Sequence, residues 1–193
     1  MILKGKERGG AAQLARYLMT MRENDHVELH EVRGFACEDL AGAFSEADAI
    51  AKGTRCRNHL FSLSLNPPQG ETVGIEAFEQ AADEIERKLG LQDQPRAIVF
   101  HEKDGRRHAH VVWSRIDSER MRAINLPHYK IKLRDVSRQL YLKHGWDMPA
   151  RAPGPRAARS LKLHARGMAA GAARWARSAR VEGRVPAVLG GLG

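Results

Sequence analysis

"RAIVFHEKDGRRHAHVVWSRI", residues 96–116, holds two β-rich runs on either side of a polar turn. The first run, 96–101, is short and apolar, and the second, 108–116, is rich in β-branched and aromatic residues. Both compositions are typical of strands. Residues 102–107 contain an Asp-Gly pair, which favours a tight reversal because both residues tolerate positive φ. The segment therefore predicts a β-hairpin, and hence a sheet with antiparallel strands.

The rest of the chain up to residue 149 alternates between strand and helix patterns. Apolar residues spaced three and four apart predict helices, and alternating or continuous apolar runs predict strands. Strands are expected at 1–4, 26–32 and 58–68, and helices at 9–21, 37–53, 74–90 and 130–145. The resulting order is β-α-β-α-β-α-β-β-α. It predicts an α+β domain over residues 1–149, with a mainly antiparallel central sheet covered by helices.

Residues 150–193 differ sharply in composition from the rest. Of these 44 residues, 30 are Ala, Gly, Arg or Pro, and nine Arg or Lys stand against one Glu. Because no apolar period is sustained, we expect a largely disordered basic tail. The composition is also typical of a GC-rich gene translated out of frame. A native reading frame that ends near Pro149 is therefore a second interpretation.

The positive charge is concentrated in parts of the chain. The formal net charge is +9 at neutral pH, yet residues 23–48 are acidic. Residues 101–143 carry eleven Arg or Lys against five acids, a net +6. Such a local basic field attracts phosphate groups and so favours a polyanionic partner. An ordinary solvated surface is the alternative interpretation.

The compartment is predicted from cysteine usage and from the apolar runs. Cys37 and Cys56 are the two cysteines of the chain and form no C-x-x-C pair, so we expect reduced thiols. The opening "MILKGKERGG" turns polar after three residues and does not resemble a signal peptide. No apolar run approaches the roughly 18 residues that span a bilayer. We therefore expect a cytoplasmic protein without a membrane segment.

Three of the nine histidines fall within residues 101–110. Because residues i and i+2 of a strand share a face, His108 and His110 should project together. The hairpin should then bring His101 beside them. Three imidazoles from two strands would make an open metal site, with positions left for water and substrate. No cysteine takes part, which argues against a closed structural zinc site.

The residues around the histidines bear on what a metal there would act on. Arg106, Arg107 and Arg115 suit contacts with a phosphodiester, and a solvated hairpin tip is the alternative. A metallohydrolase of the H-x-H-x-D-H kind is disfavoured, because Val-Val-Trp-Ser follows His110. Ordinary half-buried strand histidines also stay open as an interpretation, since H-x-H alone is a weak signal.

Several segments together resemble the relaxase/mobilisation nuclease family, the HUH-type endonucleases that nick the DNA of plasmids and mobile elements. They are "QLARYL" (13–18), "HLFSLSLNP" (59–67), the histidine segment (99–117) and "NLPHYKIKLRDVSRQLYLKHGWDMP" (125–149). The resemblance covers residues 1 to about 149. It implies a sheet-centred α+β domain that carries out metal-assisted transesterification.

The resemblance also implies a ligand set. His101, His108 and His110 match the three-histidine motif and would hold one divalent ion, Mg²⁺ or Mn²⁺, with Zn²⁺ as the alternative. The acidic residue of the motif falls within "EKD". Either Glu102 or Asp104 could orient a ligand from there, and the spacing does not choose between them.

Tyr17 matches the N-terminal tyrosine of the family, which attacks the scissile phosphate and forms a 5′-phosphotyrosine link. Without the resemblance, its place beside Leu14 and Leu18 would be interpreted as that of a core aromatic. The implied substrate is single-stranded or melted origin-of-transfer DNA, nicked at one site on one strand, with accessory relaxosome proteins as further partners. Two alternatives stay open: a non-catalytic DNA-binding remnant or accessory protein, and a metal-dependent phosphodiesterase that uses water.

Overall fold

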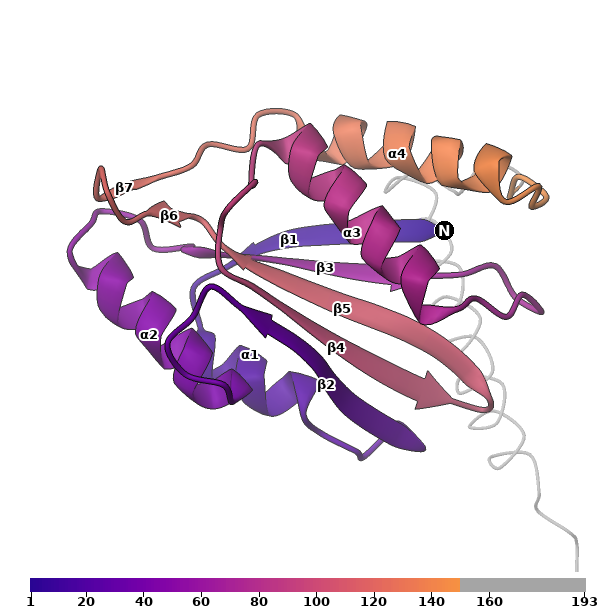
Figure 1. The fold of residues 1–193 in the computed structure, drawn as a ribbon, viewed down its shortest axis with the longest axis horizontal. Helices are drawn as coiled ribbons and strands as arrows, with labels where there is room; N and C mark the ends of the chain where they lie inside the picture. Colours follow the sequence, from indigo (N-terminus) through magenta and orange to yellow (C-terminus); the bar gives the residue numbers. More distant parts are fainter. Residues whose placement is uncertain (150–193) are drawn as a thin grey trace, which may run out of the picture. The chain divides into compact units, whose positions relative to one another are not determined.

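A computed structural model describes residues 1–149, which fold into a five-stranded sheet with four helices (Figure 1). The elements are β1 (Ile2–Arg8), α1 (Ala11–Leu18), β2 (His26–Arg33), α2 (Leu40–Lys52), β3 (Leu60–Asn66), α3 (Ile75–Leu89), β4 (Arg96–Lys103), β5 (Arg106–Ser114) and α4 (Tyr129–Lys143). The predicted α+β class and the order of these elements are confirmed. The predicted disordered tail and the interpretation of a frame ending near Pro149 concern residues outside the described range.

Two short strands were missed by the sequence patterns. β6 (Ile116–Asp117) and β7 (Arg122–Ala123) pair with each other in a separate sheet. Two residues are too few to show a period, which explains the omission. β1 is also longer than the predicted 1–4, because its polar second half pairs with β3 along its whole length. No helix within residues 1–149 has the length and hydrophobicity needed to cross a bilayer.

The sheet separates two hydrophobic layers. The strand order is β1-β3-β5-β4-β2, and each neighbouring pair is antiparallel. One face, with Phe61, Val111 and Trp113, packs in one cluster with residues of α3 and α4. The other face, with Val99 and Val112, packs with residues of α1 and α2. Figure 1 accordingly shows α1 and α2 together, apart from α3 and α4.

The β4–β5 hairpin closes through a two-residue turn. Asp104 and Gly105 have φ values of 52° and 68°, as a type I′ turn requires. Lys103 pairs with Arg106 directly across it. The predicted turn of six residues was therefore too long, because the strands continue through its polar ends. This register places His101 opposite His108.

A buried ionic cluster fastens the hairpin to α3. The Arg96 guanidinium at the start of β4 donates to Glu31 at 2.7 Å and to Glu86 at 2.8 Å. The Trp113 indole N–H of β5 also donates to Glu86, at 3.0 Å. Buried charges are tolerated when they are paired and hydrogen-bonded in this way. The cluster lies on the α3 side of the sheet, so it does not occupy the opposite face of the hairpin, which carries His101 and His108.

Replacing Gly105 with alanine should destabilise the domain. An L-residue with a side chain in the left-handed conformation costs about 1–2 kcal/mol relative to glycine. We expect the free energy of unfolding of Gly105→Ala to fall by about 1 kcal/mol in urea denaturation followed by tryptophan fluorescence. An unchanged unfolding midpoint would show that the turn does not need this conformation.

Candidate active site

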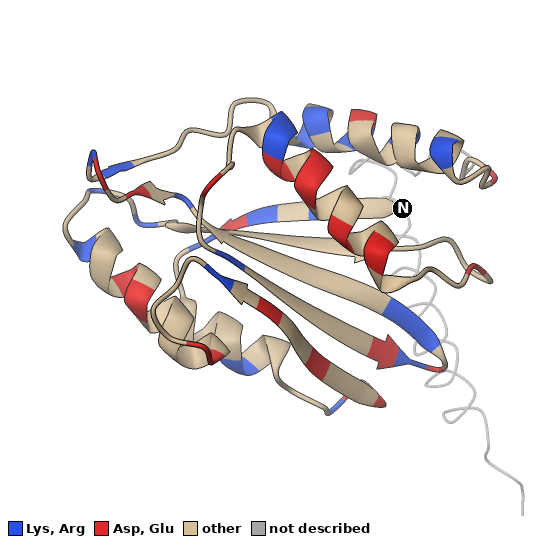
Figure 2. Cartoon of the chain, in the orientation of Figure 1, with Lys and Arg blue, Asp and Glu red and all other residues tan. Residues whose placement is uncertain are grey.

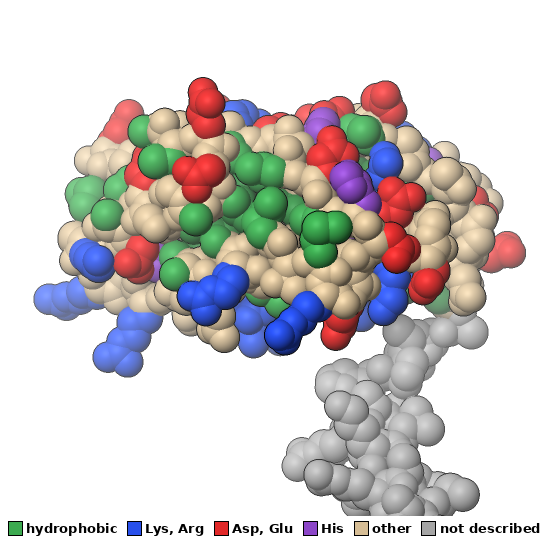
Figure 3. Space-filling view, turned by 90° about the horizontal axis from the view of Figure 1, so that it is seen from below, with side chains coloured by type: hydrophobic (Ala, Val, Ile, Leu, Met, Phe, Trp, Pro, Cys, Tyr) green, Lys and Arg blue, Asp and Glu red, His purple; other side chains and the backbone are tan. Residues whose placement is uncertain are grey.

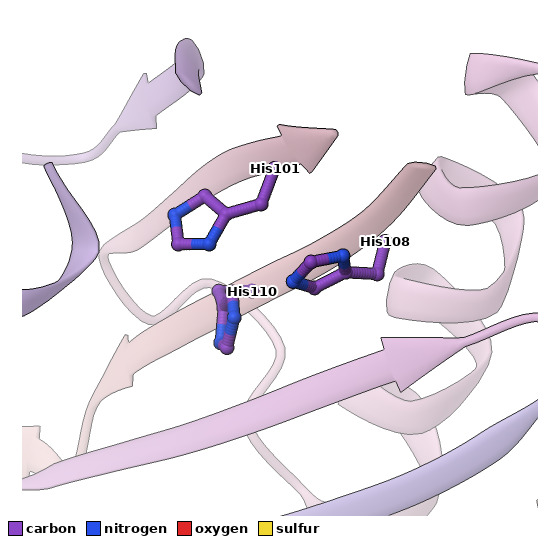
Figure 4. A group of neighbouring side chains, drawn as sticks. All are labelled: His101, His108 and His110. Atoms are coloured by element: carbon purple, nitrogen blue, oxygen red, sulfur yellow. The ribbon is translucent and has the colours of Figure 1, made fainter. Parts of the chain in front are cut away.

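The three histidines of the hairpin converge on one face of the sheet. His101 extends from β4, and His108 and His110 extend from β5, all toward the side that carries α1 (Figure 4). One ring nitrogen of each lies within 4.8 Å of the others. Their ring centroids are 4.6 to 5.4 Å apart. Strand alternation and the hairpin predicted this convergence.

The imidazoles are held in the neutral form that binds metals. Burial, followed by the charges of His101 and Arg106, lowers the pKa of His108 to about 4. Burial, followed by the charges of His101 and His108, lowers the pKa of His110 to about 3. Burial also lowers the pKa of His101. At neutral pH the cluster therefore offers nitrogen lone pairs rather than positive charge.

His101 is oriented by the main chain of α1. Its Nε2 lies 2.6 Å from the Leu18 carbonyl oxygen, at the end of the helix. Since a carbonyl oxygen only accepts, Nε2 carries the proton and Nδ1 is left as the ligand atom. Metal-binding histidines commonly donate their second ring nitrogen to such a partner, which fixes the tautomer and the ring orientation. The bond also ties one ligand to the helix that carries Tyr17.

Tyr17 stands beside this cluster and is exposed. Its ring lies edge-on to His110, with centroids 6.3 Å apart, and its side chain is 60% accessible. Leu14 and Leu18, by contrast, are buried under α1. The simpler interpretation of Tyr17 as a core aromatic is therefore wrong, because the apolar stripe of the helix turns away before reaching it.

Tyr17 and the histidines line one pocket of about 340 Å³, here called the imidazole pocket. Its other walls come from the segment that follows α1 and from the hairpin. These residues are Thr20, Arg22, Glu23, Asn24 and Lys103. None of them was a candidate from the sequence, although the first four lie only three to seven residues after Tyr17. The arrangement places a phenol, three imidazoles, two cations and the Glu23 carboxylate around one space.

The three candidate arginines occupy different places. Arg106 shares the histidine face and lines a hollow with His108. One of its terminal nitrogens donates to the Pro67 carbonyl, while its buried Nε has no partner among the described residues. Arg107 points to the opposite face, over the Phe100 ring at 5.7 Å. Of these two adjacent arginines, only Arg106 lies on the histidine face, in the hollow that borders His108. Figure 2 shows this basic pair at the start of β5.

Arg115 lies beyond the far end of β5 and is 6% exposed. Its guanidinium donates to the Asn58 and Ile124 carbonyls, both at distances of 2.8–2.9 Å, and pairs with Glu7 at 3.1 Å. Through these contacts Arg115 holds the loops at Asn58 and Ile124 in place. The contacts give no support to the predicted DNA contact, and we leave Arg115 out of the proposed interface.

Neither candidate acid contacts an imidazole in the described hydrogen bonds. Glu102 faces the other side of the sheet, where its carboxylate lies 3.7 Å from Arg107. Asp104 occupies the hairpin turn, and its backbone N–H donates to Asp25 at 2.6 Å. The orienting contact that the sequence led us to expect from an acid is instead made by the Leu18 carbonyl. A main-chain acceptor cannot be predicted from residue types, because every residue has a carbonyl oxygen.

A comparison with known protein families identifies the class of the domain. The family model described as "Relaxase: MobA/VirD2-like, nuclease domain" matches residues 17–146, from Tyr17 to Trp146. The chain belongs to this family of relaxase nuclease domains, whose members nick DNA in mobilisation. No curated protein matches the chain significantly. The histidine trio could hold the metal ion on which the family depends.

Removing one histidine should weaken metal binding strongly. We expect His108→Ala to lower the affinity for Mn²⁺ by at least about a hundredfold, because even partners outside the ligand shell contribute about 10–100-fold. Calorimetric titration of the metal-free protein measures this directly. His26→Ala is the matched control, since His26 is exposed and pairs with Glu102 on the opposite face. Equal affinities for the two variants would contradict the site.

Proposed function

We propose that the domain cuts one DNA strand by transesterification, with the Tyr17 hydroxyl as the nucleophile. The observation that carries the proposal is the placement of an exposed tyrosine, 60% accessible, on the rim of a pocket built by three neutral imidazoles. A structural tyrosine would be expected to pack or to form a hydrogen bond. Tyr17 instead has its ring edge against a candidate metal ligand and its remaining surface in solvent.

The proposed step exchanges one phosphoester for another. The Tyr17 oxygen bonds to the scissile phosphorus, the bond from phosphorus to the 3′-oxygen breaks, and the phenol proton is passed on to that departing oxygen. The products are a 5′-phosphotyrosine link and a free 3′-hydroxyl. Because the number of phosphoester bonds is conserved, the strand can be rejoined by the reverse step. Hydrolysis would forfeit this possibility.

The residues present fit a divalent ion. Three uncharged nitrogen donors converge from two strands, and the side that faces Tyr17 is open to a substrate. When bound, the ion would supply Lewis-acid stabilisation of the phosphoryl oxygens. Imidazole ligands favour Mn²⁺ or Zn²⁺ in affinity, whereas substrate phosphates and cellular supply favour Mg²⁺. We propose Mg²⁺ or Mn²⁺ as the ion, with Zn²⁺ as the alternative.

Phosphate groups beside the scissile one would be held by the basic rim of the site. Lys103 borders both the imidazole pocket and a neighbouring hollow of about 530 Å³, which Arg106 and His108 also line. The buried Nε of Arg106 has no hydrogen-bond partner among the described residues. We propose single-stranded or melted origin DNA as the substrate, with accessory relaxosome proteins in the cytoplasm as further partners.

Tyr17→Phe should abolish the covalent product. With Mn²⁺ and a labelled origin oligonucleotide, the unaltered protein should form an adduct that survives a denaturing gel. The variant keeps the ring but lacks the attacking oxygen, so adduct formation should fall by on the order of a thousandfold or more. Tyr129→Phe is the control, because Tyr129 packs against Phe61 on the other face of the sheet.

The same gel separates the alternatives. Cleavage without an adduct would identify a phosphodiesterase that uses water. DNA binding without cleavage would identify a non-catalytic remnant or accessory protein. An adduct that persists in Tyr17→Phe would assign the nucleophile to another residue.

Arg106 and Arg107 provide a second, internally matched test. They are adjacent and carry the same charge, but they face opposite sides of the sheet. We expect Arg106→Ala to weaken single-stranded DNA binding several-fold and to reduce the salt slope of the logarithm of the binding constant by about 0.7, the value for one phosphate contact. Arg107→Ala should leave that slope unchanged. Fluorescence anisotropy across a salt series measures both, and equal slopes would contradict the proposed interface.

A further inference from the structure

A series of hollows leads away from Tyr17 along α1. The imidazole pocket ends at Tyr17, which also lines a second hollow of about 300 Å³ together with Arg8, Gly10 and Gln13. A third hollow, of about 630 Å³, begins at Gly9. It is here called the His59 pocket. Its lining includes the polar and charged residues Asp48, Lys52, Thr54, Arg55, Arg57 and His59.

The second and third hollows adjoin where the β1–α1 turn meets the loop after α2. A Cβ atom built on Gly9 would lie 2.1 Å from the Arg57 carbonyl oxygen, so the two backbones are in close contact there. Gly10 and Tyr17 are seven helical positions apart, a distance of about 10 Å along the axis. An extended oligonucleotide of a few residues is long enough to cover this distance.

The charges along this path suit a polyanion. Lys52, Arg55 and Arg57 all have exposed side chains. The acid of the pocket, Asp48, lies 3.4 Å from Lys52, which offsets its charge. α1 begins without a side-chain cap and with no acid in its first turn, which leaves free N–H groups at its start. Figure 3 shows several Lys and Arg side chains along one margin of the molecule and mostly acidic ones along the opposite margin.

His59 supplies an independent sign of a ligand. The residue is only 2% exposed, and its Nε2 is buried without a hydrogen-bond partner among the described residues. The nearest charged atom is Asp48 Oδ1, 3.8 Å away, which is beyond hydrogen-bonding distance. Buried polar atoms are rarely left without a partner, so each exception calls for an explanation. In the tautomer that carries its proton on Nε2, this nitrogen would donate a hydrogen bond to an oxygen of a bound group.

We propose that the His59 pocket binds a backbone phosphate of the DNA strand that is attacked at Tyr17. Arg55 and Arg57 supply the positive charge, and His59 supplies a directed donor at the floor. The strand then runs from the imidazole pocket along α1 to the loop after α2. This inference rests on the proposed function, because it takes the substrate to be a single DNA strand.

The first test removes the two arginines together. Arg55→Ala/Arg57→Ala should weaken binding of a labelled oligothymidine of about 30 nucleotides by roughly tenfold and lower the salt slope by about 0.7–1.4, for one to two phosphate contacts. The control is Arg134→Ala/Arg138→Ala, which removes the same charge from exposed positions of α4. Both pairs are on the surface, so thermal unfolding should be unchanged in both variants.

The two cysteines provide a second measurement. Cys56 lines the His59 pocket, whereas Cys37 lies beside Gly42 near the start of α2, about 15 Å along the helix from Lys52. Oligothymidine should slow the reaction of Cys56 with a maleimide several-fold and leave that of Cys37 unchanged. In Arg55→Ala/Arg57→Ala this protection should be lost.

The outcomes distinguish the two proposals. If the unaltered protein binds DNA and forms the Tyr17 adduct, but the arginine variant matches its control and Cys56 stays unprotected, the His59 pocket is not a DNA subsite and the proposed function stands. If the unaltered protein neither binds DNA nor forms an adduct, the proposed function itself fails, and this inference fails with it.

Discussion

The register between β4 and β5 is the constraint on which the site depends. The two-residue turn at Asp104 and Gly105 sets His101 opposite His108, and the period of two along β5 adds His110 to the same face. A slip by one residue would send both β5 imidazoles into the layer under α3 and would bring Ala109 to the site. The ion cluster around Arg96 holds this register from the opposite face, where a change in pairing would separate Trp113 from Glu86.

The described domain brings the histidine face and Tyr17 together through contacts between α1 and the β4–β5 hairpin. The histidine face is formed late in the sequence, by β4 and β5, whereas Tyr17 lies early, on the first helix. Leu14 and Leu18 pack α1 against this face of the sheet, and the Leu18 carbonyl, one residue after the tyrosine, accepts from His101. A displacement of α1 would therefore change the orientation of the His101 ring and the position of the Tyr17 hydroxyl together. Family membership over residues 17–146 covers both components.

Sequence patterns predicted the sheet, the helices and the meeting of the histidines, because each of these depends on a local period or on a turn dipeptide. The role of Tyr17 was predicted only from the family resemblance, because its position beside an apolar stripe does not indicate that its side chain is exposed. The orienting Leu18 contact uses no side chain, and the burial of Arg115 depends on carbonyls contributed by distant loops. The types and spacing of the side chains predict neither feature. The acids Glu102 and Asp104 were therefore the candidates for the orienting role that the Leu18 carbonyl has.

Arg115 has a consequence for how such a domain can diversify. Its guanidinium holds the segments at Asn58 and Ile124 through their carbonyl oxygens, which every amino acid possesses. The path of the loop before β3 is thus anchored independently of the side chains that it displays. A substitution on the surface of that loop therefore leaves this support in place. The side chains that the loop displays can change without displacing the start of β3.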